Sequence, residues 1–450
     1  MDETHGLGGV DKETELKSPP AGSSPRLSVR RRVAREVTEY SDQLGMFSRN
    51  ARLFLLGSFL LSLAFSMFHL MRNLYLKEAG FGEVFIGEAL SIFSLGSLIG
   101  AVPAAVLLLR RRTKPALMLT TLGAGAGYFG IATLLSGWGI LGASLAAGVV
   151  MSVYQVAAAP FLVSHSTIVE RTHLFSANFA VGTAAGVIGS FGAGYIYHFV
   201  FDLSQNAVWG YRTCLLTGVF VALLAIIPFA LLREGPPVLR ANPFARRHLA
   251  QRKSLYMRLV LPFFLLGLGA GLVIPFLNLY FRNRFHQDGD AIGVYFGFMQ
   301  LAMTLGIMVG PPLARRWGLV RTIVYTELAS VPFMIVLAYT GNLHLAVWAF
   351  LLRGMLMNMA QPLATNFSMA IVTPSEQPLV NSLTQMAWLG SWMISAALGG
   401  GLIQRFGFAP PLLVTVALYI ASAGLYYFFF ASFEQSDRVS LPLPLTDLKG

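Results

Sequence analysis

Residues 233–258 read REGPPVLRANPFARRHLAQRKSLYMR, a strongly basic stretch that divides the chain into two long apolar halves. The stretch contains seven Lys or Arg residues and a single acid, a composition typical of a polar linker. The sequences on its two sides resemble each other when the second half is placed over the first at an offset of 205 to 207 residues. The linker therefore joins two copies of one duplicated unit.

The matching segments keep nearly one register along both halves. They are Asn73-Leu74-Tyr75-Leu76 with Asn278-Leu279-Tyr280-Phe281, Ile86-Gly87 with Ile292-Gly293, Met151 with Met357, Gln155 with Gln361, Glu170 with Glu376, Ser176 with Ser382, and Gly192-Ala193-Gly194 with Gly399-Gly400-Gly401. In a hydrophobic chain, an internal repeat of this kind is typical of membrane transport proteins.

The composition indicates a polytopic membrane protein. Hydrophobic residues make up 55% of the 450 residues, charged residues only 12%, and the mean hydropathy is +0.62. So little polar surface cannot cover a soluble protein of this size, and the lipid bilayer is the expected surroundings. The net charge of +12 comes from Lys and Arg in short loops, which excludes nucleic acid as the favoured partner.

The sequence gives no indication of an enzyme, a metal site or a cofactor. Cys214 is the only cysteine, so no intramolecular disulfide and no cysteine-based metal site can form. The eight histidines are scattered, and no nucleophile with a base and no paired carboxylates occur together. We therefore expect no catalytic residues, no bound metal and no cofactor.

Five segments are predicted along the chain: a basic arm, a helical half, the linker, a second helical half and a tail. Their bounds are 1–49, 50–232, 233–258, 259–432 and 433–450. The polar arm lacks the pattern of a cleavable signal peptide, so the first span is expected to start insertion. The arm is predicted to be disordered, as a solvated basic tail or with one helix on the membrane surface.

Twelve apolar stretches are about as long as the roughly 20 residues that a membrane-spanning helix needs, or longer. The first half contains 53–76, 83–109, 116–135, 140–163, 177–201 and 213–232, and the second half contains 259–281, 291–314, 322–340, 343–372, 383–403 and 408–430.

The loop charges predict the orientation, because Lys and Arg resist translocation. With the N-terminus inside, the inner loops hold fifteen Lys and Arg residues and the outer loops hold five. Both termini are therefore predicted to be cytoplasmic, in a multi-pass protein of the plasma (inner) membrane.

Six spans plus six, a basic central loop and a short basic loop after the second span of each half together resemble the major facilitator superfamily. The resemblance covers about residues 50–432. The family's motif after its second helix reads roughly G-x-x-x-D-R-x-G-R-R/K, and residues 310–321 read GPPLARRWGLVR. Arg315 stands at the acidic position, and the first half places Leu109 or Arg110 there. The family's usual charge pairing at the inner gate is therefore not carried over.

The resemblance implies two pseudo-symmetric six-helix bundles, with the first, fourth, seventh and tenth helices lining a cavity near the bilayer midplane. The fifth span carries Gly182, Gly186, Gly189, Gly192 and Gly194, like the glycine-rich helix of the family's antiporters. Ser190 occupies the place of the proline expected there. Small residues at this spacing are also typical of a closely packed helix face.

Polar residues within the spans are the candidates for substrate binding. In the first span, Ser58, Ser62, Ser66, His69 and Asn73 recur every three or four residues and form one stripe beside Arg72. The serines alone fit helix packing, and Arg72 either faces the cavity or reaches the outer interface. The substrate-binding candidates are His69, Arg72, Asn73, Tyr154, Gln155, Asn278, Tyr280, Gln300, Arg353, Asn358, Gln361, Gln385 and Trp388.

Four ionisable side chains have predicted roles in proton coupling, charge pairing or substrate binding. Glu88 and His69 are the candidates for carrying a proton, with a structural role for Glu88 as the alternative. Glu327 is expected to pair with Arg315, Arg316 or Arg321 near the inner side. Arg353 is predicted either to meet a substrate or to be tied by helix carbonyls or by Glu88.

We expect a secondary transporter that works as a monomer and moves a small amphiphilic or anionic organic solute by alternating access, as an exporter. Uptake of an organic anion and lipid flipping are the alternatives on the same fold. A non-transporting receptor is less favoured, because it would be expected to lose the ionisable residues at membrane depth.

Overall fold

A computed structural model describes residues 47–110, 113–233, 252–373 and 376–433 of the chain. The predicted arm up to residue 46, linker residues 234–251 and the tail from residue 434 lie outside the described residues. Within the described ranges the chain is α-helical with short 3₁₀ turns and contains no strand.

In the described residues before the linker, the helices are α2 (Arg49–Glu78), α3 (Glu83–Arg110), α4 (Thr113–Thr133), α5 (Gly137–Ser164), α6 (Ile168–Ser204), α7 (Ala207–Leu224) and α8 (Ile226–Ala230). The elements after it are α9 (Lys253–Val273), the 3₁₀ turn η1 (Ile274–Phe276), α10 (Leu277–Phe285), α11 (Gly289–Trp317), α12 (Leu319–Tyr339), α13 (Leu343–Ala370), α14 (Gln377–Phe406), α15 (Ala409–Phe430) and η2 (Ala431–Phe433).

Over the part of the chain that the structure describes, these elements form twelve helical segments that are long and apolar enough to cross a membrane, one for each predicted span. The predicted all-α membrane fold is therefore confirmed. Four helices, α6, α7, α9 and α14, begin six or more residues before their predicted spans. In α6 and α9, polar turns extend the helix. α6 begins at Ile168, where Thr167 and Glu170 form a capping box, and α9 begins at Lys253, inside the predicted linker.

Proline interrupts two of the twelve segments. The sixth segment breaks between α7 and α8 just before Pro228, and the seventh turns into η1 at Pro275. Proline has no backbone N–H and crowds the carbonyl four residues earlier, so a helix bends or breaks there. The break at Pro275 matters for the site, because it frees a backbone carbonyl at the boundary between the two halves.

The two halves repeat their internal hydrogen bonds as well as their sequence. The Tyr75 hydroxyl donates to the carbonyl oxygen of Ala132 at 2.9 Å. At an offset of 205 residues, the Tyr280 hydroxyl donates to the carbonyl oxygen of Leu337 at 2.8 Å. The first helix of each half is thereby fastened to the end of the third in the same way, as a duplicated bundle requires.

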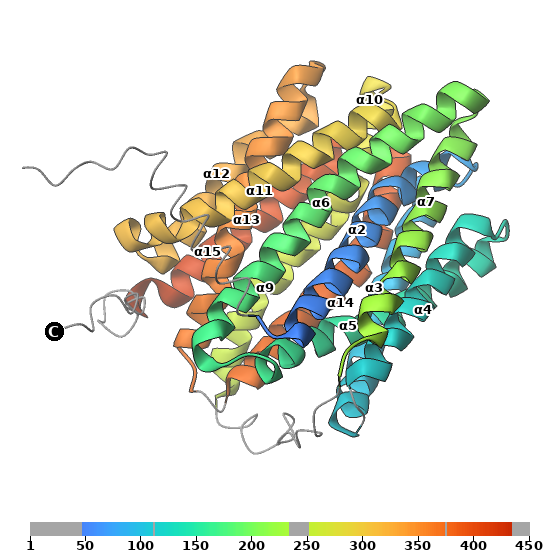
Figure 1. Cartoon of the computed structure of the whole chain (residues 1–450). Helices are drawn as coiled ribbons and strands as arrows, with labels where there is room; N and C mark the ends of the chain where they lie inside the picture. The colour runs from blue at the N-terminus through green and yellow to red at the C-terminus, as the bar shows by residue number, and fades with distance from the viewer. Residues whose placement is uncertain (1–46, 111–112, 234–251, 374–375, 434–450) are drawn as a thin grey trace, which may run out of the picture. The chain divides into compact units, whose positions relative to one another are not determined.

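Helices of the two halves pack against each other in two pairs, α3 with α14 and α6 with α11 (Figure 1). The backbones approach closely where glycines meet. A Cβ atom added to Gly87 would lie 2.5 Å from the Ala396 oxygen, and one added to Gly293 would lie 2.8 Å from Gly194 Cα. Only glycine fits such contacts without displacing backbone.

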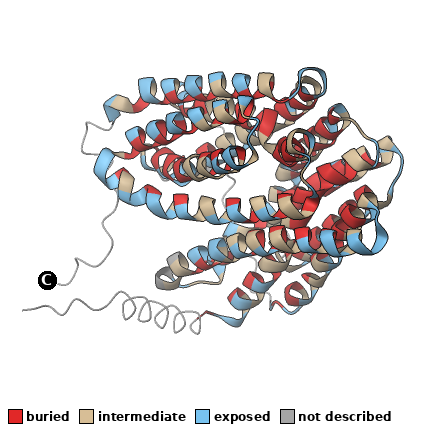
Figure 2. Cartoon of the chain, turned by 90° about the horizontal axis from the view of Figure 1, so that it is seen from above, coloured by how far each residue is buried: buried red, intermediate tan, exposed pale blue. Residues whose placement is uncertain are grey.

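Burial follows this packing. Figure 2 shows buried residues on the sides of the helices that face other helices, and exposed residues on the outer sides. Large apolar side chains on those outer sides include Trp138, which is 87% exposed, and Phe428, which is 81% exposed. An apolar exterior of this kind suits contact with lipid.

Candidate functional site

The helices have two sets of ends, which we name by their loops. At the distal end lie the loops that contain Gly80, Leu135, Gln205, His286, Gly341 and Gly407. At the linker end lie Arg233 and Arg252, the residues that flank the central linker, together with Gly318. The loop charges predict that the linker end is cytoplasmic.

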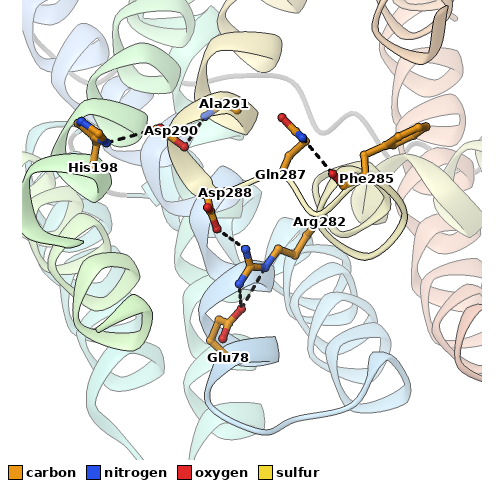
Figure 3. A network of polar contacts seen from close by, with 8 residues as sticks. All are labelled: Glu78, His198, Arg282, Phe285, Gln287, Asp288, Asp290 and Ala291. Atoms are coloured by element: carbon orange, nitrogen blue, oxygen red, sulfur yellow. Dashed lines mark hydrogen bonds and ion pairs between the residues drawn. The ribbon is translucent and has the colours of Figure 1, made fainter. Parts of the chain in front are cut away.

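An ionic network joins the two halves at the distal end (Figure 3). The Arg282 guanidinium on α10 donates from Nε and Nη2 to Glu78 Oε1 on α2, at 3.1 and 2.6 Å, and also donates to Asp288. The same figure shows His198 of α6 facing Asp290 of α11, with Nδ1 3.5 Å from a carboxylate oxygen. Both contacts cross from the first half to the second.

A second tie lies beside the first. Glu83 Oε1, at the start of α3, accepts from Lys77 Nζ at 2.6 Å and from Asn283 Nδ2 at 3.0 Å. Asn283 belongs to the second half and Lys77 to the first. The distal end is therefore closed by charged and amide groups from both halves.

Two asparagines related by the repeat form the distal wall of the interior. Asn73 Nδ2 donates to the Pro275 carbonyl at 2.6 Å, and Asn278 Nδ2 donates to the Leu70 carbonyl at 2.7 Å. The helix break at Pro275 leaves its carbonyl oxygen available for this contact. Each half thus holds the other through the same residue of the repeat.

A cavity of about 690 Å³ lies between the halves on the linker side of this wall. A second cavity of about 270 Å³ adjoins it, and Ile274, Phe296, Gln300, Trp388 and Trp392 line both. Small-molecule sites commonly have volumes of roughly 300–1,000 Å³ and mostly apolar walls. The larger cavity falls within that range, and its lining is also mainly apolar and aromatic.

The interior is accessible from the linker end. A third cavity of about 290 Å³ there is lined by exposed polar residues that include Gln361, Thr365 and Gln385, and Gln155 of the main cavity is exposed as well. The hydrogen bonds that Asn278 and Glu83 form between the halves lie in the distal half of the helices. The cavity is therefore closed at the distal end and open at the linker end.

Arg72 is the charged residue at the closed end of the main cavity. Its side chain is 1% exposed and lines the cavity. Nε donates weakly to Asn73 Oδ1 at 3.4 Å, and Nη1 is buried without a hydrogen-bond partner among the described residues. A guanidinium cannot lose its charge by deprotonation, so it lies at this depth with hydrogen-bonding capacity unused.

His69 lies one helical turn from Arg72 and lines the same cavity. Its ring centroid is 3.9 Å from that of Phe65 and 5.4 Å from that of Phe93, and Nε2 is buried without a partner among the described residues. The ring thus brings a free polar atom to an otherwise aromatic wall.

Arg353 of α13 lines the adjoining cavity and is 6% exposed. Its Nη2 donates to the Tyr419 hydroxyl at 2.6 Å, its Cζ lies 5.8 Å from the centroid of that ring, and Nε has no partner among the described residues. Tyr419 is uncharged, so it holds the guanidinium without cancelling its charge.

The structure brings most of the predicted site residues to these cavities. The main cavity is lined by His69, Arg72, Asn73, Tyr154, Gln155, Asn278, Gln300 and Trp388, the adjoining one by Gln300, Arg353, Asn358, Gln361 and Trp388, and the third by Gln361, Gln385 and Trp388.

Three predicted residues lie elsewhere. Tyr280 is fully buried in the second half and does not line a cavity, because its hydroxyl bonds Leu337. Glu88 is exposed on α3, does not line the cavities and does not tie Arg353. Glu327 is 3% exposed among α9, α13 and α15, and no described salt bridge joins it to Arg315 or Arg316.

Other lining residues were not among the sequence candidates. Phe65, Phe93 and Phe296 form much of the aromatic wall, and Tyr419 holds Arg353. Phenylalanines are too frequent in this chain for position alone to single them out, since it contains 34. Tyr419 could be recognised only from the packing of α15 against α12 and α9.

Comparison with known proteins agrees with this architecture. The chain is 24% identical over 277 residues to an uncharacterised MFS-type transporter, YceJ, of Bacillus subtilis, covering 60% of this chain and 67% of that protein. A crystal structure of a bacterial homologue of the human lysosomal transporter Spinster, inward-facing and unoccupied, superposes with a TM-score of 0.69 at 13% identity over 88% of this chain and 99% of that one.

The nucleoside transporter NupG has a TM-score of 0.67 at 14% identity, over 86% of this chain and all of that chain. The sequence model of the Major Facilitator Superfamily matches residues 54–396 and 263–445, which together span nearly all of the helical region. With twelve spans in two repeated halves around a shared cavity, this chain belongs to the Major Facilitator Superfamily of transporters.

Proposed function

We propose that this transporter carries small organic anions with an apolar or aromatic body, by alternating access. Arg72 carries the proposal: it is a permanent charge, 1% exposed, with a free donor at a cavity wall. A buried charge without a partner costs about 3–5 kcal/mol, which an anionic solute would offset. The aromatic walls favour a solute that also has an apolar body.

Arg353 supports the same solute class from the other half. Its guanidinium lines the adjoining cavity with Nε free, while Tyr419 fixes its orientation. Because the two cavities share lining residues, one solute can meet Arg72 from the first half and Arg353 from the second. Such a solute would link the halves at the point about which they rock.

The predicted direction of export is not part of this proposal. Three of the five α6 glycines that suggested it have a packing role: a Cβ on Gly186 would meet Gln300, one on Gly189 would meet Ser66, and one on Gly194 would meet the Asp290 oxygen. With the linker end on the cytoplasmic side, as the loop charges predict, the cavity faces the cytoplasm. A distal opening would complete the transport cycle.

A binding experiment with a matched pair of ligands tests the proposal. 2-Naphthoate and 2-naphthamide have nearly the same shape, but only the carboxylate is charged. We expect 2-naphthoate to raise the melting temperature of the purified protein and 2-naphthamide to leave it unchanged, because a ligand that binds the folded state stabilises it.

Variants assign the effect to the site. Arg72→Gln is expected to weaken 2-naphthoate binding roughly tenfold to a hundredfold, since a hydrogen bond to a charged group contributes about 1.5–3 kcal/mol. Arg405→Gln, the same charge change at an exposed position at the distal end of α14, is the control and should bind like wild type. Equal binding of both ligands, or equal weakening by both variants, would refute the proposal.

A further inference from the structure

Glu327 is the carboxyl group most deeply enclosed among the described residues of the helical interior. It lies on α12, 3% exposed, and Oε1 is buried without a hydrogen-bond partner within the described part of the chain. Its repeat partner in the first half, at an offset of 206 residues, is Thr121, whose hydroxyl bonds its own helix. The fold therefore does not require a carboxyl group at this position.

The surroundings of Glu327 offer hydrogen bonds but no counter-charge. It lines a small cavity with Ser422 and Tyr426 of α15, Met357 and Gln361 of α13, and Pro262 and Phe263 of α9. The Tyr426 hydroxyl is also buried without a described partner. Among the described residues, no Lys, Arg or His lines this cavity. Arg353 lines the next cavity, which shares lining residues with this one.

An ionised carboxylate enclosed in this way would be strongly destabilising, and such a group normally avoids the cost by taking up a proton. The small cavity has a volume of about 30 Å³, which is enough for one water molecule. Met357 and Gln361 line both it and the 270 Å³ cavity of Arg353, and Gln361 also lines the exposed cavity at the linker end. A proton can therefore reach Glu327 from the solute pathway through a short chain of polar groups and water.

We propose that Glu327 is a proton-binding carboxyl group of this transporter, and that its proton and an organic anion bind together. The second part rests on the proposed function. A negative charge on Glu327 would repel an anion in the neighbouring cavity, and protonation removes that repulsion. Because the two binding equilibria are linked, a bound anion raises the affinity for the proton by the same factor by which the proton raises the affinity for the anion.

Infrared spectroscopy tests the proton site without any solute. A neutral carboxyl group has a C=O stretching band that a carboxylate lacks. In full-length protein reconstituted in lipid nanodiscs at neutral pH, we expect wild type to show this band and Glu327→Gln to lose it. Glu88→Gln, which removes the rival carboxyl on α3, should keep the band, and Glu327→Asp should shift it.

Two results would overturn the assignment of Glu327. One is identical carboxyl bands in wild type and Glu327→Gln, which would mean that Glu327 is ionised or does not contribute. The other is loss of the band in Glu88→Gln alone. Glu327→Gln imitates the neutral acid in size and hydrogen bonding, so we expect this variant to fold, and Glu327→Asp gives an independent spectrum.

Coupling to the anion is tested by measuring 2-naphthoate affinity by equilibrium dialysis across the pH range in which the band disappears. We expect wild-type affinity to fall at least about fivefold on deprotonation, and affinity in Glu327→Gln to stay high throughout. Unchanged wild-type affinity across that range would refute joint binding and leave the proton site standing. Failure of 2-naphthoate to bind at any pH would instead refute the anion proposal, while the infrared result still decides on Glu327.

Discussion

The positive charge of Arg72 is not paired with a negative charge in the described part of the protein. The side chain lines the cavity and makes a weak hydrogen bond to Asn73. Its Nη1 has no partner, so no group among the described residues compensates the positive charge. Structural arginines in this chain look different: Arg212 and Arg284 donate to backbone carbonyls at the ends of α4 and α12. The contrast supports the proposal that Arg72 binds an anionic ligand.

Arg72→Gln should therefore stabilise the protein without ligand. Removing an uncompensated buried charge is expected to increase the free energy of unfolding by about 1 kcal/mol or more, and the melting temperature by about 2 °C or more. Differential scanning fluorimetry on wild type and variant measures this directly. A lower melting temperature would show instead that Arg72 supports the fold.

Glu376 provides a pH test at the linker end. Burial alone would raise its pKa, but the backbone N–H and hydroxyl of Thr373, the Tyr256 hydroxyl and Arg252 together hold the pKa below its usual value. A lowered pKa in the folded state means that ionised Glu376 stabilises the fold above its unfolded pKa. This contribution is lost as the pH falls through the folded value.

Glu376→Gln should accordingly lower the melting temperature most near neutral pH, and the difference from wild type should vanish in acid below both pKa values. Melting curves of both proteins from neutral to acidic pH test this prediction. A difference that stays constant over the whole range would mean that the ionisation of Glu376 contributes nothing.

The sequence spacing of two candidates in one helix could have predicted that their side chains point in different directions. Asn278 and Tyr280 are two residues apart, so their side chains point about 200° apart at roughly 100° per residue. Both cannot face one cavity, and the structure turns Asn278 toward it and Tyr280 into the bundle. The pair Arg353–Tyr419 is different, because it joins two separate helices and depends on packing that no single span encodes.

At the scale of helices, the twelve spans followed from hydropathy because a helix that crosses lipid must be apolar over about 20 residues. The early start of α6 carried its own signal, Thr167 followed three residues later by Glu170. The break at Pro275 was also visible in the sequence as a proline inside a span. The break makes a carbonyl oxygen available to Asn73. This contact could not be predicted, because Asn73 lies in the other half.

The contact between α6 and α11 predicts how the distal end opens. A Cβ on Gly194 would lie 2.9 Å from the Asp290 backbone oxygen and 3.3 Å from Gly293 Cα. Backbone atoms cannot move aside locally, so Gly194→Val should push the two helices apart and favour the conformation with an open distal end. Gly192→Val is the matched control, because no atom lies within 4 Å of the added Cβ.

Spin labels at Leu135→Cys and Gly341→Cys, in a Cys214→Ser background, report the separation of the halves at the distal end. Pulsed dipolar spectroscopy should find a larger share of long distances with Gly194→Val and an unchanged distribution with Gly192→Val. The same distribution in both variants would contradict a role for this contact in distal closure.

For the whole molecule, the loop charges predict a cytoplasmic linker end. In cells that express single-cysteine variants lacking Cys214, a membrane-impermeant maleimide should label Leu135→Cys at the distal end. It should label Arg316→Cys at the linker end only after the membrane is opened. Labelling of Arg316→Cys in intact cells, with Leu135→Cys protected, would reverse the orientation and make the structure outward-open.

We propose that the cavity between the halves carries an organic anion, which Arg72 binds. Counterflow tests it most directly: proteoliposomes loaded with unlabelled 2-naphthoate are diluted into a trace of the labelled anion. We expect transient accumulation of label with wild type and with Arg405→Gln, and none with Arg72→Gln. Absence of accumulation with wild type, or equal accumulation with Arg72→Gln, would contradict it.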